Sequence, residues 1–126
     1  MQNNLAYSAY MQNSVGIESP KKLIEMLYEG ILKFVYRTKK AIDDDDIEAK
    51  VYNINRANAI FFELINSLDY NQGDVAHYLA GLYTREIQLL TQANLTNEKA
   101  NLDEVIHVVK ELLEAWKEVT KEDELA

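Results

Sequence analysis

The sequence has no cysteine, one proline and only four glycines among its 126 residues. Without cysteine the chain can form neither a disulfide nor a thiolate zinc site, and it has no thiol nucleophile. Because proline and glycine interrupt helices and favour turns, their scarcity indicates a few long helices and not a turn-rich β protein. No apolar run approaches the roughly 18 residues of a membrane-spanning helix, so we expect no membrane insertion.

Basic residues are also in short supply. The chain has 13 lysines and arginines against 21 aspartates and glutamates, which gives a net charge of −8. Nucleic-acid binding depends on cations that displace counterions from phosphates, so we expect no nucleic-acid partner. The opening residues contain no basic stretch followed by an apolar one, which argues against a secretory signal and for a cytoplasmic location.

The length and the apolar content fit one packed domain. Hydrophobic residues make up 48% of the chain, and a chain of this size buries roughly two-thirds of its surface on folding. We therefore expect a single domain over residues 1–126. Within it, residues 1–18 form an N-terminal cap, residues 19–119 form the folded body and residues 120–126 form a frayed tail.

Four segments carry apolar residues at helical spacing. In the first, Ile24, Tyr28 and Ile31 are separated by four and three residues, which is typical of a helix that packs in a bundle. The expected helices span about residues 20–42, 47–68, 75–93 and 102–116.

Polar residues mark where these helices begin. Ser19 before a proline favours the start of the first helix. The pairs Asp45 with Glu48 and Asn101 with Glu104 match capping boxes for the second and fourth helices. Because the links are short, neighbouring helices must run antiparallel. The sequence predicts an all-α fold, an antiparallel up-down-up-down four-helix bundle with a short N-terminal cap segment.

The two histidines are the only candidates for a metal site. Asp74 with His77 and Glu104 with His107 each place a carboxylate and an imidazole on one helix face. A di-metal bundle site uses such pairs from two helices, but antiparallel geometry puts these pairs toward opposite ends. We therefore expect two surface histidines, no metal and no cofactor.

His107 raises a second chemical alternative. Together with Lys110 it resembles the His-x-x-Lys pattern of histidine phosphotransfer bundles. Glu111, one turn on, would repel an incoming phosphoryl group. A phosphotransfer domain stays an alternative, and we expect that the protein is not an enzyme.

The predicted helices carry more apolar residues than a narrow seam requires. The first three have both a central stripe and apolar shoulders beside it. The stripe of the second helix is Ile47, Val51, Ile54, Phe61, Phe62 and Ile65. The stripe of the third is Val75, Leu79, Leu82, Leu89, Leu90 and Ala93, with Tyr83 and Ile87 to one side. The apolar residues of the fourth are Leu102, Val105, Ile106, Val109, Leu112, Leu113 and Trp116. One interpretation is that the shoulders pack against adjacent helices of a square bundle. The other is that they line open grooves that bind another protein chain, with apolar residues 1–18 as a removable lid.

Short motifs occur in a fixed order along nearly the whole chain. They are Tyr7-Ser8-Ala9-Tyr10, Ile17-Glu18-Ser19-Pro20, Leu23-Ile24-Glu25-Met26-Leu27-Tyr28-Glu29-Gly30, Glu63-Leu64, Leu68-Asp69, Gly73-Asp74-Val75-Ala76, Leu82-Tyr83, Leu90-Thr91-Gln92-Ala93-Asn94 and Leu112-Leu113-Glu114-Ala115-Trp116. In their order and spacing these motifs resemble the flagellin-specific export chaperones of bacteria, the FliS family. The sequence departs from that family at Thr84-Arg85-Glu86, where relatives often have an aromatic residue.

The resemblance implies a four-helix bundle that binds the C-terminal segment of flagellin in the cytoplasm. It implies that binding prevents premature polymerisation and aids delivery to a component of the flagellar export gate, without nucleotide or cofactor. A co-chaperone or a flagellar regulatory protein is a further candidate partner. The chief alternative is a generic helical-bundle adaptor for another export or regulatory protein.

Partner-binding residues are expected in two groups, the N-terminal lid and the grooves. The lid residues are Tyr7, Tyr10, Val15 and Ile17. The groove residues are Leu23, Leu27, Ile54, Ala57, Phe61, Leu64, Leu82, Tyr83 and Ile87.

Overall fold

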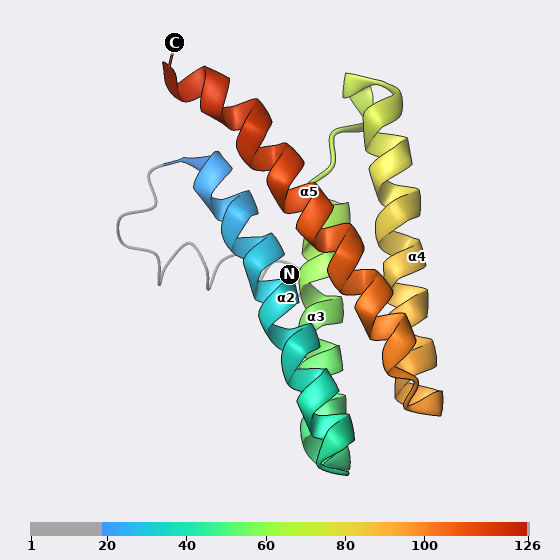
Figure 1. Cartoon of the computed structure of the whole chain (residues 1–126). Helices are drawn as coiled ribbons and strands as arrows, with labels where there is room; N and C mark the ends of the chain where they lie inside the picture. The colour runs from blue at the N-terminus through green and yellow to red at the C-terminus, as the bar shows by residue number, and fades with distance from the viewer. Residues whose placement is uncertain (1–18, 126) are drawn as a thin grey trace.

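The computed structural model describes residues 19–125 of the chain. Four long helices and one short 3-10 turn make up this part of the molecule (Figure 1). The elements are α2 (Pro20–Asp43), α3 (Ile47–Asn66), η2 (Tyr70–Gln72), α4 (Asp74–Thr96) and α5 (Lys99–Leu125). Among the helices of this range, none is long and apolar enough to cross a bilayer.

The helices form a closed ring in which each packs against two neighbours. Consecutive helices lie side by side, and α5 returns to pack against α2. The chain runs alternately down and up through the four helices (Figure 1). The prediction of an all-α antiparallel bundle is confirmed.

The observed N-cap residue matches the predicted one at α2 and differs from it at α3 and α5. The Ser19 hydroxyl accepts a hydrogen bond from the backbone N–H of Lys22 at 3.4 Å. The second helix is capped by Asp46 and not by Asp45, because Asp45 adopts a left-handed φ of 53° that takes it out of the cap position. The Asp46 carboxylate accepts instead from the N–H of Ala49 at 3.0 Å.

The fourth helix begins earlier than the expected cap at Asn101. Asn97 adopts a left-handed φ of 59° and its N–H donates to the carbonyl of Ala93 at 2.8 Å, which closes α4. Such a turn needs few residues, so α5 begins at Lys99 and Asn101 lies inside it. At its other end α5 continues to Leu125, beyond residue 119, where the bundle was expected to end.

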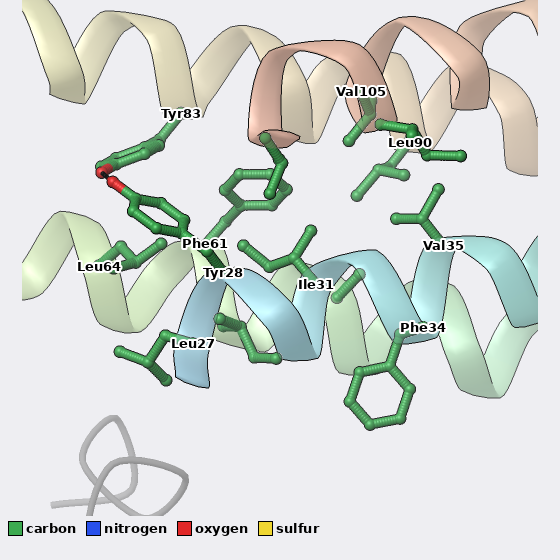
Figure 2. Close-up of a cluster of buried hydrophobic side chains, with 14 of the residues drawn as sticks. Leu27, Tyr28, Ile31, Phe34, Val35, Phe61, Leu64, Tyr83, Leu90 and Val105 are labelled. Atoms are coloured by element: carbon green, nitrogen blue, oxygen red, sulfur yellow. Dashed lines mark hydrogen bonds between the residues drawn. The ribbon is translucent and has the colours of Figure 1, made fainter. Parts of the chain in front are cut away.

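The core runs the length of the bundle between all four helices (Figure 2). The apolar periodicity predicted the core-facing side of α2 correctly. On the next two helices it placed four side chains in the core that are in fact exposed: Ile47, Val51, Phe62 and Val75. Consecutive residues differ by about 100° around a helix. Phe62 therefore lies in solvent although Phe61 beside it is fully buried.

Candidate partner-binding face

Helix α5 crosses the bundle diagonally, and this crossing creates the candidate site. Near its start it is tied to α4, where Arg85 Nη2 lies 2.5 Å from Glu104 Oε1. Near its end it is tied to α2, where the Trp116 indole N–H donates to the carbonyl of Lys21 at 2.9 Å. The two helices therefore diverge toward the first half of α4 (Figure 1). Of the four neighbouring helix pairs, α4 and α5 pack least closely.

An apolar stripe occupies that side of α4. Val75, Tyr78 and Leu82 follow at spacings of three and four, which places them within an arc of about 60° on the helix. Val75 and Tyr78 are 67% and 69% exposed, and Leu82 is half-buried. Arg85, one turn further along the same side, reaches across to α5. The stripe therefore faces the region from which α5 has turned away.

Helix α5 carries a matching stripe. Val108, Leu112, Ala115 and Val119 follow Glu104 at spacings of four, four, three and four, so they share the side that Glu104 turns toward α4. Val119 is 64% exposed, Ala115 is exposed, and the other two are half-buried. We call the two stripes together the α4–α5 face. Its members are Val75, Tyr78, Leu82, Val108, Leu112, Ala115 and Val119.

Beneath this end of the bundle lies a buried group of three aromatic side chains. The hydroxyls of Tyr28 and Tyr83 meet at 2.6 Å inside the core (Figure 2). Burial raises the pKa of both tyrosines, so both phenols stay neutral at physiological pH. The Phe61 ring packs on Tyr83, with 6.0 Å between ring centroids. The exposed stripes therefore adjoin a buried aromatic support.

The structure places most of the predicted groove residues inside this support. Seven of them are at most 2% exposed, and their contact with a partner stays a prediction. These seven are Leu23, Leu27, Ile54, Ala57, Phe61, Leu64 and Tyr83. Leu82 and Ile87 are half-buried, and Leu82 belongs to the α4–α5 face. The predicted lid residues Tyr7, Tyr10, Val15 and Ile17 lie outside the residues that the structure describes.

Sequence reasoning missed most of the α4–α5 face. Val75 and Leu112 were placed in core stripes, and Tyr78, Val108, Ala115 and Val119 were in no stripe. The sequence did contain a sign of this face: α5 has a second line of apolar residues at helical spacing, beside the line that packs in the core. Periodicity could not reveal which of the two lines another helix covers.

Both histidines lie at the surface, as predicted. His77 packs beside Tyr70, with ring centroids 4.8 Å apart, and His107 Nε2 lies 3.2 Å from Glu111 Oε1. Within residues 19–125, no group of three or more histidines, aspartates or glutamates is arranged to hold a metal ion.

One carboxylate lies in the core stripe of α4. The Glu86 side chain is fully buried; one oxygen lies 3.3 Å from Arg85 Nη1 and the other, Oε1, has no hydrogen-bond partner. Burial raises the pKa of Glu86, and the Arg85 charge offsets only part of that effect. Because the folded protein holds this proton more tightly than the unfolded chain, the contribution of Glu86 to stability falls as pH rises from the unfolded pKa through the higher folded pKa.

We expect Glu86→Gln to unfold at higher urea concentration than the wild type at pH 7, with a gain of about 1 kcal/mol, because it removes a buried and partly unpaired charge. The gain should shrink as the pH falls toward the ordinary glutamate pKa, where wild-type Glu86 is also neutral. Urea unfolding at several pH values measures both effects. The exposed change Glu118→Gln serves as the control and should alter neither. A Glu86→Gln protein less stable than the wild type at pH 7 would contradict the prediction.

The fold and the exposed stripes first define a class. A helical bundle that keeps an extended apolar face uncovered is typical of a protein-binding module, because such faces are seldom left exposed without a partner. Comparison with known families then gives the particular group. The model of the family described as flagellar protein FliS matches residues 1–123, so the chain belongs to the FliS family.

Individual relatives agree with this assignment. The flagellar secretion chaperone FliS of Campylobacter jejuni is 64% identical to the chain, and the match covers 100% of this chain and 99% of the relative. The protein of the same name from Bacillus subtilis is 36% identical over 93% of this chain and 87% of its own length. The one from Salmonella typhimurium is 33% identical over 87% and 83%.

Proposed function

We propose that this protein is a cytoplasmic flagellar secretion chaperone and that the C-terminal segment of flagellin binds along its α4–α5 face. The observation that carries the proposal is the pair of exposed apolar stripes on two helices that diverge. The family assignment and the names of the relatives support the export role. The protein acts by covering its client and needs no cofactor.

The shape of the face suits a helical segment. The α5 stripe from Val108 to Val119 extends over about 16 Å, or three turns. An amphipathic helix presents apolar residues at the same repeating spacings of three and four. Such a helix, laid between the two stripes, buries its apolar side against both of them, which is a common mode of peptide recognition.

Binding of this kind combines protection with release. Apolar contact with the chaperone hides the client surface that otherwise associates with other flagellin molecules. A segment that folds only on binding spends part of its interaction energy on ordering, which keeps affinity moderate for its size. The client can therefore pass on to a component of the export gate.

Isothermal titration of the full-length protein with a synthetic peptide of the flagellin C-terminal segment tests the proposal. We expect micromolar or tighter binding with a negative heat-capacity change, the mark of apolar burial. The control is a peptide of the same composition with its apolar periodicity scrambled. Absence of binding to the flagellin peptide would favour a bundle adaptor for another protein.

A further inference from the structure

Phe34 on α2 differs from the other large side chains of the buried cluster. Its ring points away from the centre of the bundle, whereas Ile31 and Val35 on the same helix point inward (Figure 2). It is nevertheless only 5% exposed. The ring is therefore buried although it lies on the outer side of α2.

Three cations lie over this ring. Lys33 Nζ lies 4.7 Å from the centroid of the Phe34 ring, Arg56 Cζ lies at 5.4 Å and Arg37 Cζ at 5.9 Å. Lys33 and Arg37 come from successive turns of α2, and Arg56 comes from α3. Their alkyl stems shield the ring, and their charges are attracted to its face. We call these four residues the Phe34 cluster.

The cations of the Phe34 cluster have no ion-pair partner among the side chains that the structure describes. Neither Lys33, Arg37 nor Arg56 pairs with a carboxylate of residues 19–121, whereas Lys39 pairs with Asp103 and Lys99 with Asp43. Each of the three cations lies at most 5.9 Å from the centroid of one ring, and like charges gathered there repel one another. They do so on a protein whose net charge is −8. The cluster is thus a small positive site on an acidic molecule.

The geometry points to a docking site for an acidic segment of a second protein, separate from the client. Carboxylates of that segment pair with the three cations. An apolar side chain that lies between those carboxylates in the segment packs on the Phe34 ring in place of the alkyl parts of the lysine and arginines. The two guanidinium groups suit carboxylates in particular because their N–H groups can donate in pairs. No covalent step is involved.

The size of the cluster argues for a short protein segment and against an extended polyanion. A nucleic acid or an anionic membrane would also approach the many carboxylates of this chain and be repelled. The cluster lies on the seam between α2 and α3, and the ring of helices puts that seam opposite the one between α4 and α5. An acidic segment can therefore bind while the α4–α5 face is occupied.

Fluorescence anisotropy with the full-length protein tests this inference. The probe is a labelled peptide in which glutamates flank a central phenylalanine. The variant is Lys33→Gln/Arg37→Gln/Arg56→Gln, and the matched control is Lys22→Gln/Lys117→Gln/Lys121→Gln, which removes the same charge at distant exposed sites. We expect the first triple variant to bind the probe at least about tenfold more weakly, the control to stay within about twofold of wild type, and added salt to weaken binding.

Equal losses in both triple variants would overturn the inference, because bulk charge alone would then explain binding. So would displacement of the probe by the flagellin peptide, or stronger capture of the wild type than of the Phe34-cluster variant on phosphatidylserine vesicles. Sedimentation showing a wild-type dimer that the Phe34-cluster variant lacks would make a second copy the occupant and also overturn it. We expect the Phe34-cluster variant to bind the flagellin peptide as the wild type does. This measurement distinguishes failure of the acidic-segment site from failure of the proposed chaperone function.

Discussion

The double variant Tyr78→Asp/Val119→Asp should bind the flagellin C-terminal segment about 100-fold more weakly than the wild type, a loss of about 2.7 kcal/mol. Tyr78 and Val119 stand on opposite stripes of the α4–α5 face and are both more than 60% exposed. Fully burying an apolar side chain of this kind contributes about 1.5–3 kcal/mol. Aspartate removes that contribution and adds the cost of desolvating a charge against apolar surface.

The same variant should retain its fold because neither side chain contributes to the core. Exposed substitutions usually change stability by less than about 0.5 kcal/mol, so its urea midpoint should match that of the wild type. The matched control is Ile47→Asp/Leu95→Asp, which introduces the same charge at two equally exposed apolar residues away from the face. Titration calorimetry should show control affinity within about threefold of wild type. Equal weakening of both variants would mean that the client does not bind at the α4–α5 face.

The fold was largely readable from the sequence because local signals and the helical period agree. Ser19 caps the first helix as its hydroxyl and the following proline indicated. The second helix begins at Ile47, where the acidic run ends. Short links then leave an antiparallel bundle as the simple arrangement. These features depend on residues close together in the chain.

The candidate site was not readable because it depends on how two helices cross. Periodicity finds apolar lines on α5 but does not show that Trp116 is held by the backbone of α2 while Glu104 is held by α4. Those two contacts fix the diagonal course of α5 across the bundle, and they leave one of its two apolar lines uncovered. Both link residues far apart in the sequence, so no local pattern encodes them.

The core stripe of α4 was misassigned for a related reason. Tyr83 was placed beside the stripe, yet it is buried and bonded to Tyr28, and Glu86 lies within the buried line. A carboxylate at a core position breaks the binary pattern of apolar and polar residues on which such assignments rest. Glu86 pairs with Arg85, the adjacent residue in the chain, but the burial of its side chain becomes visible only in three dimensions.

Phe61→Ala should lower the free energy of unfolding by about 3–5 kcal/mol, the usual cost of truncating a buried phenylalanine. Phe61 is fully buried between α3 and α4 and packs on the Tyr83 ring. Truncation leaves a cavity at the support of the α4–α5 face and removes the aromatic contact. Because native domains are stable by only about 5–15 kcal/mol, a large share of the total is lost.

Phe62→Ala is the matched control, since it makes the same change one residue further along the same helix. Phe62 is 52% exposed, and we expect its truncation to cost less than about 1 kcal/mol. Urea unfolding followed by circular dichroism compares the two directly. Similar losses of unfolding free energy for both variants would contradict the description of Phe61 as buried and Phe62 as exposed. If Phe61→Ala alone is strongly destabilised and also binds its client poorly, the weak binding has a structural explanation. The α4–α5 face rests on the part of the core that this truncation removes.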